Sequence, residues 1–276
     1  MSADWLKDNI NRDDLVVVDA SWFLPAEGRS GGVEYLDGHI PGAVFFDIDL
    51  NSDHGQNLPH MLPSAEVFAD LAGALGLSRD RTIVVYDSTG IRAAARVWWT
   101  LRVMGFVEVF VLDGGLGAWT RLGLSLQAGE AVSRPAKVTP QYRAQLVRGL
   151  SDVMSLVQSR DCQLVDARSG PRFRGEVPEP RAGLRSGHMP GALNVPFDQV
   201  LTPLGTLKSP DDLARVFADA GVKVTEPIVT TCGSGVTASV LALALAAMGH
   251  DQVAVYDGSW SEWGALADTP VVTGHG

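Results

Sequence analysis

The stretch Pro227-Ile-Val-Thr-Thr-Cys-Gly-Ser-Gly-Val-Thr-Ala238 combines a predicted strand, a turn and the start of a predicted helix. Its first part, residues 228–231, is a short β-branched run, which is typical of a buried strand. Glycines then turn the chain, and residues 236–248 form an alanine-rich, helix-favouring run that ends at Gly249. A single cysteine, Cys232, therefore lies between the end of a strand and the start of a helix.

This position favours an ionised, reactive sulfur on Cys232. The first amides of a helix have no partners within the helix, and the helix dipole adds a positive partial charge there, so a thiolate is favoured over a thiol. Gly233 and Gly235 allow the backbone to curl around the sulfur. We therefore expect an accessible nucleophilic thiolate, in a loop that can also hold a persulfide. The alternative interpretation is a buried structural cysteine, the usual state of a free cysteine.

Four segments of the chain recur in the same order at an offset of 144 to 149 residues. The matched pairs are 16–20 with 163–167, 38–43 with 187–192, 84–90 with 229–235, and 113–119 with 257–263. Ordered self-similarity of this kind indicates a duplicated domain. At the position of Cys232 the first copy has Asp87, which cannot attack sulfur as a thiolate can. We therefore expect the first copy to be catalytically silent, with Asp87 as an ordinary loop or cap residue.

Each copy alternates short β-branched runs with helical patterns. In the first copy the predicted strands are 15–19, 43–46, 82–86 and 107–112, and the predicted helices are 64–75, which begins at an N-cap serine, and 91–104. The alternation predicts an α/β fold in which a mainly parallel sheet is flanked by helices. The expected domains are 1–125 and 146–276. They are joined by a predicted linker over 126–145, where Pro135 and Pro140 stand in a stretch of little periodicity.

Composition narrows the class of protein. The chain has 276 residues, of which 46% are hydrophobic and 20% charged, as expected for globular domains with sizeable cores. A net charge of −10 without a basic run argues against nucleic acid or an anionic membrane as partner. No predicted membrane span or signal peptide stands out. The cysteines, Cys162 and Cys232, are too few for a disulfide framework and suit a reducing cytoplasm, and the histidines lack metal-site spacing.

The loop Cys232-Gly-Ser-Gly-Val-Thr-Ala238 resembles the active-site loop of the 3-mercaptopyruvate sulfurtransferases of the rhodanese superfamily. Thiosulfate sulfurtransferases of the same superfamily usually have basic residues within this loop, whereas Gly233 and Ser234 are uncharged. Rhodanese-like phosphatases have a longer loop that ends in arginine, and residues 232–240 contain none. The resemblance covers nearly the whole chain and implies two tandem rhodanese-like domains with the active site between them.

The resemblance also implies roles for residues outside the loop. Arg172 and Arg181 match the family's substrate-binding arginines, and a planar guanidinium suits the carboxylate of a keto acid. Asp49 and His60 lie in segments that resemble those supplying an aspartate and a histidine to the cleft, and with Ser234 they would form a Ser–His–Asp relay. The persulfide cradle would consist of the backbone amides of Gly233, Ser234, Gly235, Val236, Thr237 and Ala238.

Other polar residues nearby are expected to be structural. Arg168, Arg174 and Arg185 are interpreted as surface arginines that pair with neighbouring glutamates or keep the loop soluble. His39 and His188 occupy equivalent Gly-His-x-Pro-Gly turns of the two copies. Because the silent copy has this histidine too, an architectural role such as a turn hydrogen bond is favoured over a catalytic one.

The implied reaction takes sulfane sulfur from 3-mercaptopyruvate, carries it as a Cys232 persulfide and releases pyruvate. The acceptor would be a thiol, such as a reduced thioredoxin-like protein or a small thiol, or cyanide, and no cofactor or metal is required. The sequence leaves two alternatives open: a thiosulfate sulfurtransferase on the same scaffold, and a non-catalytic rhodanese-like binding module.

Overall fold

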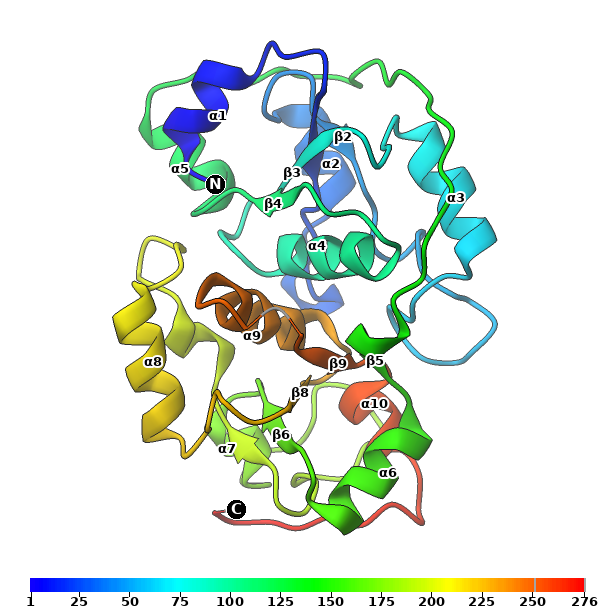
Figure 1. Cartoon of the computed structure of the whole chain (residues 1–276), viewed down its shortest axis with the longest axis vertical. Coiled ribbons are helices and arrows are strands. Elements are labelled where there is room, and N and C mark those ends of the chain that lie inside the picture. Colours follow the sequence, from blue (N-terminus) through cyan, green and yellow to red (C-terminus); the bar gives the residue numbers. More distant parts are fainter. Residues whose placement is uncertain (251, 276) are drawn as a thin grey trace. The chain divides into compact units, whose positions relative to one another are not determined.

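The computed structural model describes residues 1–250 and 252–275 and divides the chain into two compact units (Figure 1). The first unit contains Met1–Asp53, Leu62–Arg143 and Pro203–Leu207, and the second contains His54–Met61, Ala144–Thr202 and Lys208–Gly276. Each half of the sequence thus contributes a short segment to the other half's unit. Most of the stretch predicted as a linker, up to residue 143, groups with the first unit.

The first unit is built on a four-stranded parallel sheet with the order β2-β1-β3-β4. The strands are β1 (Leu15–Asp19), β2 (Val44–Phe45), β3 (Thr82–Tyr86) and β4 (Val109–Val111). The helices are α1 (Ala3–Asn9), α2 (Gly31–Asp37), α3 (Ala65–Ala74), α4 (Ala93–Val103) and α5 (Gly115–Arg121), with a 3-10 turn at Pro25–Glu27. Every strand and helix predicted for the first copy is present, with the ends of some one or two residues shorter. The unpredicted helices α1, α2 and α5 span only seven residues each, too few for a clear periodic pattern.

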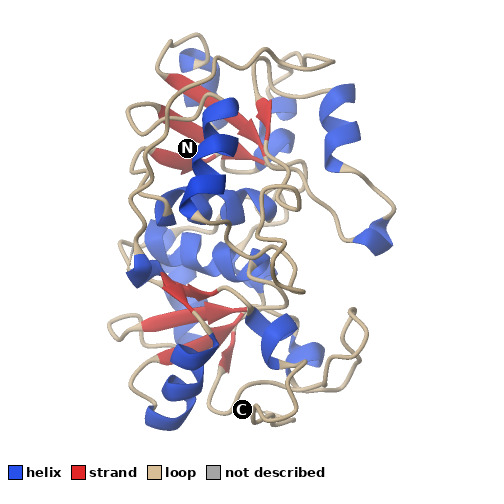
Figure 2. Ribbon diagram, turned by 90° about the vertical axis from the view of Figure 1, so that its right-hand side faces the viewer, coloured by secondary structure: helices blue, strands red, loops and turns tan. Residues whose placement is uncertain are grey.

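Helices cover this first sheet on both faces, as a parallel sheet requires (Figure 2). Leu6 of α1 and Trp119 of α5 pack with Val17, Val84 and Tyr86 on one face. Helix α4 packs on β3 and β4. Helix α3 starts as predicted, because the Ser64 side chain accepts the backbone N–H of Val67.

The second unit repeats this plan with one more strand, in the parallel order β5-β9-β8-β6-β7. The strands are β5 (Val147–Arg148), β6 (Gln163–Asp166), β7 (Leu193–Asn194), β8 (Ile228–Thr231) and β9 (Ala254–Tyr256). The helices are α6 (Leu150–Ser159), α7 (Gly170–Phe173), α8 (Pro210–Asp219), α9 (Val236–Ala247) and α10 (Ser259–Trp263), with 3-10 turns at Ala144–Leu146 and Phe197–Val200. The predicted α/β class, with parallel sheets flanked by helices, is confirmed in both units.

In the second unit, α6, α7 and α10 share one core cluster with β6, β8 and β9, and the tryptophans of α10 are fully buried in it. Helix α9 packs on β8 and β9 and is apolar almost all round, as its buried position demands. The helix predicted over 236–248 is therefore confirmed. No helix in the described ranges combines the length and the apolar character needed to cross a membrane.

The two turn histidines have the architectural role that their repetition predicted. His39 Nδ1 lies 2.8 Å from the carbonyl oxygen of Tyr35, and His188 Nδ1 lies 2.8 Å from that of Phe173. Each ring stacks on the aromatic ring of the same partner, with centroids 4.1 Å and 3.7 Å apart. Both histidines are fully buried, and in the described structure neither Nε2 has a hydrogen-bond partner.

We predict that His188 makes the second unit sensitive to acid. Burial lowers the pKa of His188 below its usual value, since a charged ring loses its hydration there. Below the usual pKa the unfolded chain binds this proton more readily than the folded chain, so stability present at neutral pH is lost as the pH falls. Urea unfolding between pH 7 and pH 5 should show a steeper loss for the wild type than for His188→Gln. The exposed His54→Gln is the control, and equal slopes in all three proteins would contradict the prediction.

Candidate active site

Cys232 immediately follows β8, and α9 begins four residues later at Val236. Gly235 makes the turn between them with φ 77°, a left-handed conformation that favours glycine. The predicted strand–loop–helix setting of the cysteine is therefore present. The residue is 2% exposed, however, so the expectation of an accessible sulfur is corrected. Its backbone is fixed on both sides, since its N–H donates to Ser259 Oγ (3.2 Å) and its carbonyl accepts the N–H of Trp260 (2.9 Å).

The backbone amides that follow Cys232 are available to a ligand. Among the described residues, the N–H groups of 233–237 donate to no protein acceptor. Several of these amides belong to buried residues, including Ser234 and Val236, and buried N–H groups are normally paired. A buried thiolate needs such donors, because it has little water to stabilise its charge. The arrangement therefore favours a bound anion over a purely structural cysteine.

The first copy shows what this loop does when an anion occupies it. Asp87, at the position of Cys232, accepts the N–H of Thr89 at one carboxylate oxygen (2.9 Å). Its other oxygen accepts the N–H groups of Arg92 (2.8 Å) and Ala94 (2.9 Å). Asp87 is thus the loop and cap residue that the sequence predicted. In its own copy the Asp87 carboxylate accepts hydrogen bonds from a nest of backbone amides, and the amides of 233–237 beside Cys232 form a similar nest.

Ser234 and His60 lie together, although 174 residues separate them in the sequence. His60 belongs to the segment of the first half that groups with the second unit. Its Nδ1 is hydrogen-bonded to Ser234 Oγ at 3.1 Å, and both side chains are buried. Asp49, the third member of the predicted relay, belongs to the first unit and accepts the indole N–H of Trp22 at 2.8 Å. Its partnership with His60 stays a prediction.

The two arginines that the resemblance assigned to the substrate also reach the cysteine loop. A Cβ placed on Gly233 would stand 3.2 Å from Arg172 Nη2 and 3.9 Å from Arg181 Nη1. Both guanidinium groups therefore approach the backbone beside Cys232, and Arg172 leaves only a tight space for a side chain at 233. Two guanidinium groups beside amides that have no protein acceptor form a set of donors suited to an anionic substrate.

Arg168 is not the surface arginine that the sequence suggested. Its side chain is fully buried, with Nη2 2.6 Å from Asp166 and Nη1 2.9 Å from Glu179, and it lies over the ring of Trp260. Burial alone would lower the pKa of Arg168, but the two carboxylates outweigh it and raise the pKa. Glu179 also accepts two hydrogen bonds from Arg172, at 2.5 Å and 3.3 Å, and so ties the predicted substrate arginine to the buried network.

The remaining arginines divide between two roles. Arg174 pairs with the exposed Glu176 at 2.7 Å, as predicted for a surface residue. Arg185 is partly buried and donates to the carbonyl groups of Trp263, Gly264 and Thr269, so it holds the segment after α10 rather than a glutamate. The sequence predicted that arginines of this loop pair with Glu176 and Glu179, and Glu179 does pair with Arg168, but no local pattern indicated that this pair is buried. The contacts of Arg185 join residues distant in the chain, and the sequence carried no signal for them.

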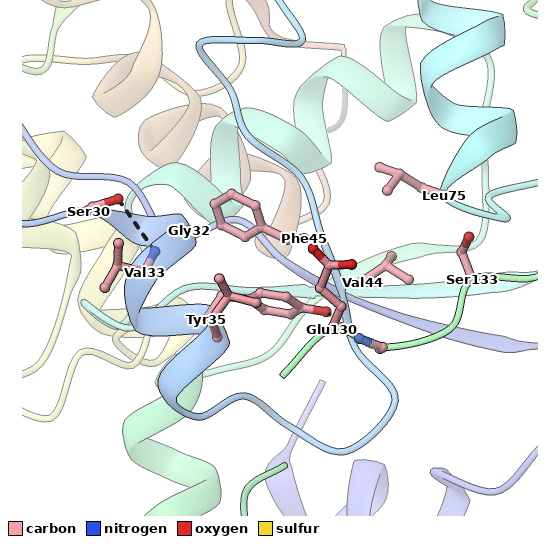
Figure 3. Close-up of a pocket in the computed structure, with 11 residues that line it drawn as sticks. Ser30, Gly32, Val33, Tyr35, Val44, Phe45, Leu75, Glu130 and Ser133 are labelled. Carbon is pink, nitrogen blue, oxygen red and sulfur yellow. Dashed lines mark hydrogen bonds between the residues drawn. The ribbon is translucent and has the colours of Figure 1, made fainter. Parts of the chain in front are cut away.

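A separate cavity of about 510 Å³ lies in the first unit (Figure 3). Tyr35, Phe45 and Leu75 contribute to its walls, with Glu130 and Ser133 beside them. The Tyr35 hydroxyl donates to the carbonyl of Ala43. None of the residues predicted to take part in catalysis lines this cavity.

A model of the rhodanese-like domain matches residues 2–122 and again residues 150–266. The two matches cover most of the sequence, and the chain belongs to the rhodanese-like family as a tandem of two such domains. The resemblance seen in the loop and the repeat is thereby confirmed at the level of the family.

Proteins similar to this chain over most of its length include several sulfurtransferases. The chain is 44% identical over 272 residues to the 3-mercaptopyruvate sulfurtransferase of Escherichia coli, covering 98% of this chain and 96% of the relative. It is 42% identical to the human enzyme of that name, covering 95% and 91%. The solved structure of the Escherichia coli 3-mercaptopyruvate sulfurtransferase SseA superposes with a TM-score of 0.86 at 42% identity, over 94% of this chain and 98% of that one. The Tum1 protein of Saccharomyces cerevisiae gives 0.91 at 30% identity, over 100% and 98%.

We predict that Glu179→Gln destabilises the second unit and loosens Arg172. The substitution removes the charge that balances two guanidinium groups, one of them fully buried. Loss of one partner from a buried ion pair costs on the order of 3 kcal/mol in the free energy of unfolding. Urea unfolding measures this loss. Glu176→Gln removes the exposed partner of Arg174 and serves as the matched control, and an equally small effect of both substitutions would disprove the role of Glu179.

Proposed function

We propose that this chain is a 3-mercaptopyruvate sulfurtransferase that carries sulfur as a persulfide on Cys232. The observation that carries the proposal is the set of unpartnered amides at residues 233–237, flanked by Arg172 and Arg181. Its family membership and the names of its near full-length relatives support the same reaction.

In the first half-reaction the Cys232 thiolate attacks the sulfur of 3-mercaptopyruvate. A sulfur–sulfur bond forms and the carbon–sulfur bond breaks, and the electron pair of the broken bond leaves with pyruvate as its enolate. A proton then converts the enolate to pyruvate. Arg172 and Arg181 hold the carboxylate and the keto oxygen of the donor, where a guanidinium fork also stabilises the charge that develops on the enolate.

The Ser234–His60 pair supplies or accepts the proton in this step. A hydroxyl bonded to an imidazole can pass a proton along the bond, and the imidazole then completes the transfer. Asp49 is proposed to orient His60, as the resemblance implies. This pair lies beside the nucleophile, because Ser234 is two residues after Cys232.

In the second half-reaction a thiophile takes the outer sulfur. A thiolate attacks it, the persulfide bond breaks, and Cys232 regains its electron pair while the acceptor leaves as a persulfide; cyanide would leave as thiocyanate. Between the two steps the amides of residues 233–238 hold the persulfide anion, just as amides of the first copy's loop donate to the Asp87 carboxylate. We propose a reduced thioredoxin-like protein or a small thiol as acceptor, in a reducing compartment such as the cytoplasm. Two chemical steps through one enzyme-bound intermediate imply ping-pong kinetics.

A thiosulfate sulfurtransferase remains the second candidate, because relatives named for both donors occur among the matches. One is the mitochondrial thiosulfate/3-mercaptopyruvate sulfurtransferase 1 of Arabidopsis thaliana, which is 40% identical over 98% of this chain and 77% of that protein. The uncharged Gly233 and Ser234 favour 3-mercaptopyruvate, since a dianionic donor would gain from basic residues in the loop.

We predict that 3-mercaptopyruvate adds the mass of one sulfur atom to Cys232. Intact-protein and peptide mass spectrometry after donor treatment should locate the added sulfur, and a thiol or cyanide should remove it. Cys232→Ser should abolish the change, whereas Cys162→Ser should not. Rates measured side by side should favour 3-mercaptopyruvate over thiosulfate; the reverse preference would select the second candidate, and no added sulfur from either donor would exclude both.

We also predict that the arginines and the relay affect different kinetic constants. Arg172→Ala and Arg181→Ala should raise the KM for 3-mercaptopyruvate, since each removes a donor to the bound carboxylate or carbonyl. Ser234→Ala and His60→Asn should lower kcat by about 10²-fold or more, with a smaller change in KM, because they act on the proton. Steady-state kinetics of the four variants test this division. Equal effects of all four on KM alone would contradict the relay.

A further inference from the structure

The first three residues of α10 make hydrogen bonds to the backbone of the cysteine loop at residues 232 and 233. Ser259 Oγ accepts the N–H of Cys232 at 3.2 Å and donates to the carbonyl of Tyr256 at 2.8 Å. The N–H of Trp260 donates to the carbonyl of Cys232. Ser261 donates twice to the carbonyl of Gly233, from its N–H at 2.8 Å and from its hydroxyl at 2.6 Å. Both serines are buried.

The silent copy shows which of these contacts belong to the fold and which to the cysteine. Leu116 N–H donates to the carbonyl of Asp87 at 3.0 Å, the same bond that Trp260 makes to Cys232. The positions of Ser259 and Ser261, however, are occupied by Gly115 and Gly117 in the matched segment. The catalytic copy therefore adds two hydroxyl groups to a contact that the fold makes without them.

Ser259 is also held in a conformation that glycine would adopt more easily. Its φ is 50°, close to the 54° of Gly115, and left-handed backbone is unfavourable for a residue with a side chain. In the first copy a Cβ on Gly115 would clash with the carbonyl oxygen of Asp87. In the second copy the Ser259 side chain is accommodated despite the strained backbone, and its hydroxyl accepts the backbone N–H of Cys232.

Because each peptide group is planar, a contact that fixes a carbonyl of the cysteine loop also fixes the direction of the following N–H. In a trans peptide the C=O and the following N–H point in opposite directions. A carbonyl of Cys232 fixed toward Trp260 aims the N–H of Gly233 away from α10, and a carbonyl of Gly233 fixed toward Ser261 does the same for the N–H of Ser234. In the first copy the corresponding amide, that of Thr89, points at the side chain of residue 87.

We propose that Ser259 and Ser261 are positioning residues of the cysteine loop: Ser261 holds the peptide that directs the Ser234 amide toward the sulfur, and Ser259 holds the peptide that carries the nucleophile. In the silent copy the Asp87 carboxylate gathers these amides by itself, since it accepts three of their hydrogen bonds. Sulfur is a weaker acceptor than a carboxylate, so the amides around Cys232 need support from the opposite side. The inference rests on the proposed persulfide chemistry, which it deepens.

The test converts the catalytic copy to the glycines of the silent copy, with Ser259→Gly, Ser261→Gly and the double variant. Glycine suits the backbone at 259, so this change relieves strain while removing the acceptor for the Cys232 amide. We expect each single variant to lower kcat with 3-mercaptopyruvate on the order of ten-fold and the double variant on the order of a hundred-fold, with donor KM little changed. The pH dependence of the Cys232 alkylation rate should shift to higher pH, because the variants stabilise the thiolate less well. Arg172, Arg181 and His60 are unaltered in these variants, so the shift measures the contribution of the loop amides.

Two further variants separate positioning from folding. Ser261→Thr keeps the hydroxyl and should restore the activity that Ser261→Gly loses. Ser21→Ala is the matched control in the first copy, where the Ser21 hydroxyl accepts the N–H of Ser88, and it should leave kcat and the alkylation profile unchanged. Wild-type kcat together with an unshifted alkylation profile in the double variant would overturn the inference. If the double variant does not fold, the comparison of Ser261→Gly with Ser261→Thr decides it, and equal activity of these two variants would overturn the inference. A wild type that takes up no sulfur would instead refute the proposed function, while the alkylation profiles still judge the positioning role.

Discussion

A buried sulfur beside unpaired backbone amides is the constraint on which the rest of this structure depends. Cys232 is almost completely enclosed, so water contributes little to stabilising a charge on it. In the reaction we propose, the amides of residues 233–237 and the guanidinium groups near Gly233 take over that task. Amide dipoles fixed by the fold need no reorganisation when charge appears on the sulfur, which is how a preorganised site gains over water.

The fold supplies those dipoles through the way a parallel sheet meets its helices. β8 delivers the cysteine at its carboxyl end, Gly235 makes the left-handed turn, and α9 begins at once. The same unit recruits His60 from the other half of the sequence, so that an imidazole reaches Ser234. The buried carboxylate of Glu179 holds Arg172 and Arg168 together. Arg172, which we propose binds the substrate, thus shares one charge network with the buried Arg168.

Duplication gives the protein a built-in comparison. Both copies keep the turn histidine and the contact from the last helix to the loop. Both also keep an aspartate at the end of matching strands, Asp19 of β1 and Asp166 of β6. They differ where the chemistry differs: a carboxylate fills the nest in one copy, and in the other a cysteine leaves it open and is braced by Ser259 and Ser261. Features common to both copies are accounted for by the fold, while features of one copy indicate function.

The sequence by itself determined the α/β class, the duplication, the position of Cys232 between strand and helix, and the presence of Asp87 in place of a cysteine in the first copy. These follow from local periodicity, glycine placement and self-similarity, which short segments express without help from the rest of the chain. It missed α1, α2 and α5, the burial of Arg168 and the tie from Glu179 to Arg172. Only the tertiary structure decided that His60 meets Ser234, that both arginines reach Gly233, and that the sulfur is enclosed. Contacts between residues far apart in sequence leave no local pattern, because they depend on how whole elements pack.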